Sequence, residues 1–549
     1  MGKVKNVLFI MCDQLRWDYL SCAGHPTLKT PNIDGLARRG VRFTRAYVQS
    51  PICGPSRMSF YTGRYMNSHG SNWNGVPLKV GEMTMGDYYR ALGVRTALVG
   101  KTHMTADIEG MKRLGVDPST IIGVRVSECG FDPYERDDGL HTQGPDGGYL
   151  KDRPPRYNKY LNDKGYAGDN PWHDYANAAL GEDNKLASGW AMRHARKPAR
   201  VKEEDSETPY MTRRGIDFIR EAGDAPWCMH LSYIKPHWPY IAPAPYNTMY
   251  SAKDLIPVVR SQDERTNPHP VLEQFMAPLV SRSFSRDEVR EEVVPVYMGL
   301  VKQIDDQMGV LFRFLEENGY FDNTMIVFTS DHGDYLGDHW MGEKEFFHEP
   351  SVKIPLIIYD PSREADATRG TVCDELVESI DLAPTFLEAF GGNPLEQSHR
   401  LEGRSLMPLL HGQKPATWRE VVVSEYDYAI QTPGIVLKVA PKDSRLFMLA
   451  DKRWKYIHCI GFRPMLFDME NDPNELRDLG AEEAHADVRR RFKEALHDWA
   501  LRSAQRTTRS EQQIIAMRGK AERRGVLIGV WDESDVPNEM WKGYLGDDR

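Results

Sequence analysis

The sequence predicts an α/β fold, in which a large mixed, mostly parallel sheet is sandwiched by helices and a smaller α+β subdomain follows towards the C-terminus. Two observations support this prediction. Short apolar runs of the kind buried inside a sheet recur along the chain, and helical patterns lie between them. Polar, glycine or proline residues follow the runs. Strands and helices that alternate in this way form a sandwich with helices on both faces of the sheet.

Each element has its own pattern. Continuous apolar residues predict strands of a parallel sheet at 7–12, 96–99, 229–233, 325–329 and 355–359. Apolar residues at helical spacing predict helices at 33–39, 85–92 and 298–317. In such sheets, ligands bind beyond the carboxyl ends of the strands, so the residues that follow the runs are candidates for a functional site.

Two domains are expected. Residues 1–415 form the catalytic α/β domain, and a weakly periodic insertion at about 105–210, rich in Gly, Pro, Asp, Tyr and Trp, covers the sheet and shapes the substrate site. Residues 416–549 form a C-terminal subdomain with a small antiparallel sheet, a packing helix and a charged tail. The antiparallel strands are expected at 420–426, 445–449 and 454–459.

The composition excludes several classes of protein. A net charge of −9 argues against a nucleic-acid partner, because phosphate binding needs clustered Lys and Arg, although a small pocket can still bind an anion. The seven cysteines are scattered and indicate neither a disulfide framework nor structural zinc. The first apolar run stops at Asp13 without a cleavage site, so we expect a strand there and no signal peptide or membrane span. We therefore expect a cytoplasmic protein without a membrane or nucleic-acid partner.

Cys53 lies in the most informative segment, Ser50-Pro51-Ile52-Cys53-Gly54-Pro55-Ser56-Arg57, which Thr62-Gly63-Arg64 follows. A cysteine next to Gly-Pro is excluded from a helix interior, since proline fixes φ and lacks an N–H donor. Arg57 is a fixed cation that stabilises an anion or lowers the pKa of a neighbour. The alternative is an inert, buried cysteine in a turn.

Carboxylate, amide and imidazole groups follow two of the predicted strands. Asp13 and Gln14 end the first, and Asp331 and His332 end the fourth. Together they form a hard-to-borderline set of donors suited to a divalent cation. The alternative for each aspartate is a helix cap or a turn residue.

Basic residues complete the candidate site. Lys101 and His103 follow the second strand, His237 follows the third, and Lys344 lies thirteen residues after Asp331. A single lysine is usually a solvated surface charge, and a single histidine is often only hydrogen-bonded. Their positions after strands that already carry ligand candidates favour a functional role. Asn74, in Asn72-Trp73-Asn74-Gly75, is a further candidate donor to a substrate oxygen.

The pattern Cys-x-Pro-Ser-Arg-x4-Thr-Gly-Arg resembles that of the type I sulfatases of the alkaline phosphatase superfamily. Thr-Pro-Asn-Ile-Asp at 30–34 and Leu-Phe-Asp-Met-Glu-Asn-Asp-Pro-Asn-Glu at 466–475 resemble two further family motifs. Many members carry a second Asp where Gln14 stands and an Asn where His332 stands. These departures resemble instead the phosphonate monoester hydrolases and choline sulfatases.

The resemblance implies two cofactors, a divalent metal ion and a formylglycine. The metal, Ca²⁺ or Mn²⁺, is bound by Asp13, Gln14, modified Cys53, Asp331 and His332. A formylglycine-generating enzyme oxidises Cys53 during maturation, and an oxygen of the aldehyde hydrate attacks sulfur or phosphorus in line. Positive charge for the equatorial oxygens comes from the metal and from Arg57, Lys101 and Lys344. His237, assisted by Lys344, protonates the leaving alcohol, and His103 is the base for hemiacetal breakdown.

Three functions follow as hypotheses. The first is a sulfate-ester hydrolase of arylsulfatase type, acting on a small anionic ester. The second is a phosphonate monoester or phosphodiester hydrolase with the same site, and one protein can act on both, because both substrates are tetrahedral monoanions. The third is a catalytically inactive family member that binds anions. We also expect a homo-oligomer, either a dimer or a tetramer.

Overall fold

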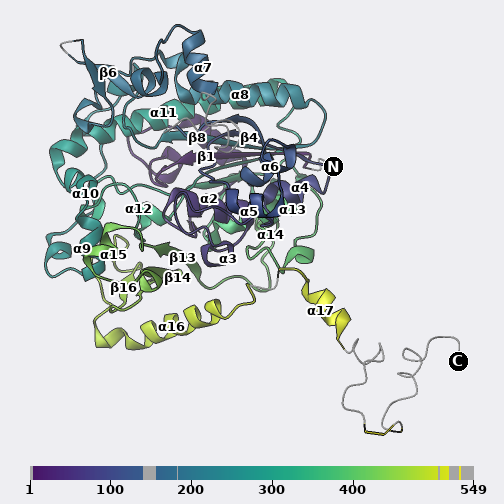
Figure 1. Ribbon diagram of the computed structural model, residues 1–549. Helices are drawn as coiled ribbons and strands as arrows, with labels where there is room; N and C mark the ends of the chain where they lie inside the picture. Colours follow the sequence, from purple (N-terminus) through teal and green to yellow (C-terminus); the bar gives the residue numbers. More distant parts are fainter. Residues whose placement is uncertain are drawn as a thin grey trace.

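The computed structural model describes residues 4–139, 156–181, 184–504, 507–518, 531–532 and 534. An eight-stranded sheet with the order β11-β2-β10-β9-β1-β8-β4-β5 runs through it. Its strands are β1 Asn6–Asp13, β2 Val41–Phe43, β4 Arg95–Gly100, β5 Asp132–Arg136, β8 Trp227–Pro236, β9 Thr324–Ser330, β10 Leu356–Tyr359 and β11 Thr371–Cys373. This mixed, mostly parallel sheet between helices confirms the predicted fold class (Figure 1).

Helices cover both faces of the sheet. In the view of Figure 1, α8 (Glu207–Ala222) and α11 (Asp287–Glu317) lie above it, and α2 (Cys53–Thr62), α4 (Met85–Arg90) and α13 (Leu382–Ala389) lie below it. Successive residues of β1 enter two different hydrophobic cores. Phe9 packs in the core that contains Phe60 of α2, and Leu8 packs in the core that contains Phe218 of α8. Both faces of β1 are therefore buried, which explains its continuous apolar run.

One predicted strand direction is wrong. Strand β10, expected in parallel order, pairs antiparallel with both β9 and β2. A run buried on both faces has the same apolar composition in either direction, so the pattern predicts the strand and leaves its direction undetermined. The four other predicted runs form β1, β4, β8 and β9, and these strands are parallel to their neighbours in this group.

The predicted helices are present, with one different boundary. They correspond to α1 (Pro31–Arg39), α4 and α11. Helix α11 begins at Asp287 rather than at residue 298, and it contains Pro295. All residues from Val293 to Val301 are buried, so packing against the sheet maintains the helix across the proline.

The segment expected to be an insertion contributes to the main sheet as well. Within it, Asp132–Arg136 forms the edge strand β5, which is parallel to β4. The hairpin of β6 (Ala178–Leu180) and β7 (Leu186–Ser188) follows further along. Residues 140–155 and 182–183 of this segment lie outside the described residues.

A separate antiparallel sheet lies towards the C-terminus, as predicted. Its strands are β13 (Val422–Asp427), β14 (Arg445–Ala450), β15 (Trp454–Cys459) and β16 (Met465–Asp468), and helix α16 (Ala486–Ala500) follows. Beyond residue 518 the structure describes only 531, 532 and 534, so most of the predicted tail lies outside the described residues. Among the helices described, none has the length and apolar character that a bilayer crossing requires.

Candidate active site

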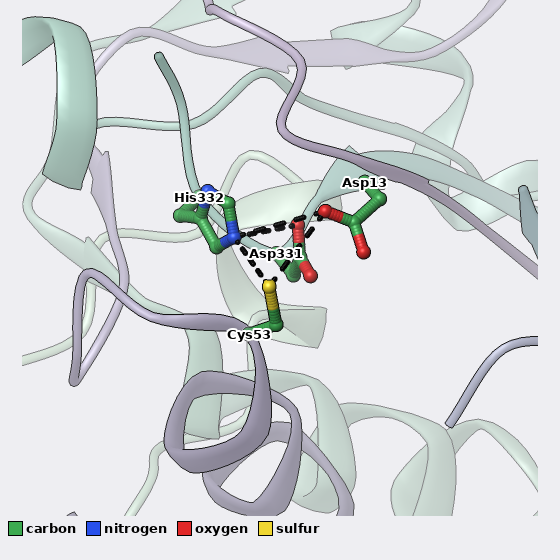
Figure 2. A group of neighbouring side chains, drawn as sticks. All are labelled: Asp13, Cys53, Asp331 and His332. Carbon is green, nitrogen blue, oxygen red and sulfur yellow. Dashed lines mark hydrogen bonds and ion pairs between the residues drawn. The ribbon is translucent and has the colours of Figure 1, made fainter. Parts of the chain in front are cut away.

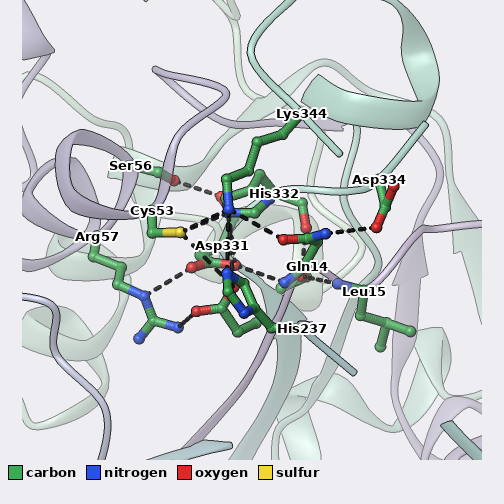
Figure 3. A network of polar contacts seen from close by, with 12 residues as sticks. Gln14, Leu15, Cys53, Ser56, Arg57, His237, Asp331, His332, Asp334 and Lys344 are labelled. Carbon is green, nitrogen blue, oxygen red and sulfur yellow. Dashed lines mark hydrogen bonds and ion pairs between the residues drawn. The ribbon is translucent and has the colours of Figure 1, made fainter. Parts of the chain in front are cut away.

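The ends of four parallel strands bring the predicted site residues together. Asp13 is the last residue of β1, and Lys101, His237 and Asp331 follow β4, β8 and β9. These strands are neighbours in the sheet, so their carboxyl ends meet at one edge. Figure 3 shows several of these side chains converging beside Cys53.

Cys53 is the first residue of α2, and its side chain points into this cluster (Figure 2). Only 1% of Cys53 is exposed. Its Sγ lies 3.0 Å from Nε2 of His332 and 3.3 Å from Nζ of Lys344. Burial raises the pKa of the Cys53 thiol, but Lys344, His332 and Lys101 outweigh this effect and hold it well below its ordinary value. The position of Sγ therefore stabilises an anion.

Four buried side chains form a group with the composition of a divalent-cation site (Figure 2). Ligand atoms of Asp13, Cys53, Asp331 and His332 all lie within 4.8 Å of one another. Nδ1 of His332 lies 2.9 Å from the carbonyl oxygen of Gly333, so it donates there and leaves Nε2 to bind a metal. Burial lowers the pKa of His332, but Asp331 and Cys53 raise it to about 9. The group thus attracts positive charge, and its donors fit a divalent ion.

Gln14 is oriented by two residues that the sequence analysis missed. Its Nε2 donates to Oδ2 of Asp334 at 2.5 Å and to the hydroxyl of Tyr240 at 3.1 Å. Tyr240 also donates to Asp334, at 2.5 Å. The Gln14 Oε1 atom accepts from Nζ of Lys344 at 3.1 Å and so faces the cluster. Asp334 was detectable because it follows Ser-Asp-His-Gly directly, whereas no sequence signal links Tyr240 to this site.

Arg57 lies behind the carboxylates of the cluster. The side chain is fully buried, and its Nε donates to Oδ2 of Asp331 at 2.7 Å. Its Nη2 lies 3.2 Å from Oδ2 of Asp13, and its Nη1 donates to the carbonyl of Lys101 and the hydroxyl of Ser232. Arg57 was expected to contact substrate oxygens directly. These contacts favour a different role, in which Arg57 positions the two carboxylates.

Two lysines and a histidine surround the cluster on its other sides. Nζ of Lys101 lies 2.6 Å from Oδ2 of Asp13, and Nζ of Lys344 lies 3.3 Å from Nε2 of His237. Nδ1 of His237 lies 2.7 Å from the carbonyl oxygen of Trp238, to which it donates. Burial lowers the pKa of His237, although Asp13 opposes this effect. Since Nδ1 donates to the Trp238 carbonyl, Nε2 is the ring nitrogen of His237 that faces Lys344.

His103 and Asn74 contact the segment that carries the cysteine. The half-buried His103 adopts a φ of 56°, and its backbone N–H donates to Asp138 at 3.1 Å. Its side chain contributes to the low pKa of the Cys53 thiol. Asn74 Oδ1 accepts the backbone N–H of Gly54 at 2.7 Å, so the asparagine holds the first turn of α2. The structure thus brings all the predicted site residues together.

The comparisons with known proteins identify the family. The chain matches the sulfatase family over residues 5–392 and the C-terminal family of N-sulphoglucosamine sulphohydrolase over residues 337–502. It is 32% identical to the multifunctional alkaline phosphatase superfamily protein PehA of Trinickia caryophylli, covering 92% of this chain and 96% of that protein. An arylsulfatase of Clostridium perfringens is 28% identical over 86% of this chain and 90% of its own.

Solved structures show the same relationship. A phosphonate monoester hydrolase from Silicibacter pomeroyi superimposes with a TM-score of 0.78 at 28% identity, covering 91% of this chain and 96% of that one. These matches extend over the sheet, the candidate site and the C-terminal antiparallel sheet. They confirm the resemblance that the motifs predicted. The chain therefore belongs to the sulfatase family of hydrolases.

Proposed function

We propose that this protein is a formylglycine- and metal-dependent hydrolase of sulfate esters. The observation that supports this proposal most strongly is the set of cations around Sγ of Cys53, where Lys344, His332 and Lys101 hold the pKa of the thiol low. A buried position that stabilises an anion beside a divalent-cation site suits the attacking oxygen of an ester hydrolase. The similarity to an arylsulfatase and to a choline-sulfatase of Rhizobium meliloti supports the same chemistry.

The donor set indicates which residues would hold the metal. They are Asp13, Gln14, Asp331, His332 and the modified Cys53. When present, the ion and the formylglycine would supply a Lewis acid and a hydrate oxygen of lowered pKa. Carboxylate oxygens suit Ca²⁺, whereas the imidazole of His332 suits Mn²⁺, so we propose one of these two ions.

The protein's own side chains supply charge and protons. Lys101 and Lys344 place fixed positive charge next to Cys53, where the oxygens of a tetrahedral anionic ester would lie. Nε2 of His237 and Nζ of Lys344 are 3.3 Å apart and form a pair that can deliver a proton to the leaving oxygen. His103, whose side chain helps to lower the pKa of Cys53, is the base that we propose for breakdown of the hemiacetal ester. Arg57 holds Asp13 and Asp331 in position.

A second substrate class is supported by a specific observation. The phosphonate monoester hydrolases from Silicibacter pomeroyi and Agrobacterium radiobacter have TM-scores of 0.78 and 0.75 with this chain. Gln14 and His332 resemble a branch that contains these hydrolases as well as the choline sulfatases. Sulfate and phosphonate monoesters are both tetrahedral monoanions, so the same lysines suit either. We therefore propose phosphonate monoesters or phosphodiesters as the alternative substrates. A third outcome is activity on both sulfate esters and phosphonate esters.

The decisive experiment compares phenyl sulfate with a phenyl phosphonate ester. The protein is reloaded with either Ca²⁺ or Mn²⁺ after mass spectrometry has confirmed formylglycine at position 53. Faster turnover of the sulfate supports the main proposal, and faster turnover of the phosphonate supports the alternative. If the modified, metal-loaded protein hydrolyses neither, both proposals are wrong, and an inactive anion-binding protein remains. A Cys53→Ala variant controls for contaminating hydrolases.

We also propose a cytoplasmic location and a homo-oligomeric state, a dimer or a tetramer. All seven cysteines are free, which suits a reducing compartment. Light scattering coupled to size exclusion measures the mass of the assembly. A monomer at micromolar concentration would contradict the oligomer proposal.

A further inference from the structure

An aromatic wall lies beside the residues that face the leaving group. The rings of His237 and Trp238 have centroids 4.2 Å apart, and Nζ of Lys344 lies 5.9 Å from the centre of the Trp238 ring. The ring of Trp190 continues the wall, with its centroid 5.0 Å from that of Trp238. We define the aromatic wall as Trp190 and Trp238. It therefore begins at the proton-donating pair of the proposed reaction.

The wall is more exposed than the proton-donating pair beside it. His237 and Lys344 are buried, whereas Trp190 is 43% exposed and Trp238 is half-buried. A large aromatic side chain left open to solvent next to a buried polar cluster is characteristic of a ligand site, since such sites combine apolar walls with a few fixed polar groups. The leaving group of an ester whose anionic end lies among the lysines would extend along this wall.

Hydrogen bonds connect the loop that contains Trp190 to β8, the strand that precedes His237. The backbone N–H of Gly189 donates to the carbonyl of Asn177 at 2.9 Å. The side-chain oxygen of Asn177 accepts from Nζ of Lys235, also at 2.9 Å, and Lys235 belongs to β8. Trp190 is further fixed because its Nε1 donates to Nδ1 of His173 at 3.3 Å. These hydrogen bonds hold the wall in place before a ligand binds. Lys235, which lies outside the cluster around Cys53, contributes through its hydrogen bond to Asn177.

One carboxylate holds the Trp238 ring in place, and both indole faces can stack on an aromatic ring. The only carboxylate that contacts the wall among the described residues is that of Glu343, which accepts from Nε1 of Trp238 at 2.8 Å. The same carboxylate lies 3.3 Å from Nζ of Lys344. The Glu343 carboxylate therefore links the Trp238 ring to Lys344 and fixes the ring beside the proton-donating pair. Two indole faces offer offset or edge-to-face stacking to an aromatic ring.

We propose that Trp190 and Trp238 form the leaving-group subsite, and that Trp190 makes the protein selective for esters of aromatic alcohols over those of small alkyl alcohols. This inference rests on the proposed function, whether the ester is a sulfate or a phosphonate. It assigns a substrate class through Trp190, which lies in the segment that was expected to shape the substrate site but had no candidate residue of its own, and through Trp238, which follows β8.

The test is the ratio of kcat/KM for a phenyl ester to that for the matching ethyl ester. In Trp190→Ala this ratio falls about ten-fold, because one stacking surface is lost. In Trp190→Phe at least half of the selectivity remains, since a ring is still present. Trp531→Ala is the matched control, because Trp531 is 96% exposed and remote from the site, and its ratio stays within two-fold of the parent.

Calorimetric binding of phenol gives a second readout that needs no turnover. Phenol binds the parent protein and Trp190→Phe, and its affinity falls about ten-fold in Trp190→Ala. Equal losses on phenyl and ethyl esters, or phenol binding that Trp190→Ala leaves unchanged, would overturn the inference while the proposed function stands. Failure of the parent to hydrolyse either ester would instead overturn the proposed function, and phenol binding would still test the wall.

Discussion

Replacement of Asp334 by asparagine tests how the site orients Gln14. The Asp334 carboxylate is fully buried, and its Oδ2 accepts both from Nε2 of Gln14 and from the hydroxyl of Tyr240, each at 2.5 Å. These bonds point the Gln14 oxygen towards Lys344 and the metal-ligand group. The side-chain amide of asparagine has the same shape, but its NH₂ group must face either Gln14 and Tyr240 or the backbone N–H of Leu336, which donates to Oδ1 of Asp334 at 3.0 Å. When the NH₂ group faces Gln14, Gln14 either loses its partner or turns its own NH₂ towards Lys344.

The structure fixes the size of the expected effect. A buried donor left without a partner costs about 1–3 kcal/mol. Loss of the group that orients a metal ligand typically weakens metal affinity about 10- to 100-fold, equivalent to about 1.4–2.8 kcal/mol. We therefore expect Asp334→Asn to bind Mn²⁺ and Ca²⁺ about 10- to 100-fold more weakly than the parent.

The assay is calorimetric titration of the metal-stripped protein with each ion. Tyr240→Phe is the matched control, since it removes one hydrogen bond to Asp334 but leaves the bond between Asp334 and Gln14 intact. Its affinity is expected to fall by less than that of Asp334→Asn. Affinity within two-fold of the parent for a folded Asp334→Asn variant would refute the reasoning, because Gln14 would then keep its orientation without a carboxylate at position 334.

Three further predictions concern stability and the metal. Lys455 is fully buried between Glu349 and Glu475, and its Nζ lies 2.9 and 2.6 Å from their carboxylate oxygens. Lys455→Met should therefore lower the free energy of unfolding by about 3–5 kcal/mol in denaturant titrations, because it leaves two buried carboxylates without their cation. Adding Glu475→Gln should recover part of this loss. A hydrogen bond to Asp360 raises the pKa of His411 in the folded protein. The protonated His411 therefore stabilises the fold fully below its unfolded pKa of about 6.5, and this stabilisation is lost as pH rises through the higher folded pKa. His411→Gln should thus lower Tm more at pH 6 than at pH 9, and an equal loss would contradict this. Chelation should abolish turnover and lower Tm, readdition of the ion should restore both, and an unchanged Tm would argue against a resident metal.

Local apolar patterns predicted the central strands because both faces of each strand are covered. Strand β1 was expected at 7–12 and extends from Asn6 to Asp13, so the residues that follow it were placed correctly at the edge of the sheet. The direction of β10 was not predictable, since burial on both faces looks the same in either direction. The start of α11 was not predictable either, because Pro295 is tolerated only through packing that the local sequence does not reveal.

The candidate site was predicted where a residue follows a strand or lies in a recognisable motif, and missed where a side chain reaches across from another segment. Lys101 and Asp331 belong to the first group, since the ends of parallel strands converge. Tyr240 and Trp190 belong to the second, because their partners, Asp334 and Trp238, lie far away in the sequence or on another loop. No periodicity encodes such a contact. It appears only when the chain is folded.

The strand order β9-β1-β8-β4 has a consequence for protein synthesis. The group that fits a divalent ion joins Asp13, near the start of the chain, to His332, with α2 between them in the sequence. Contacts between residues so far apart form only after the intervening chain has been made and folded. A nascent chain that ends before β9 lacks Asp331 and His332, two of the four residues of this group. Metal binding by chains truncated at successive lengths would therefore show the chain length at which this group, and with it the centre of the sheet, first forms.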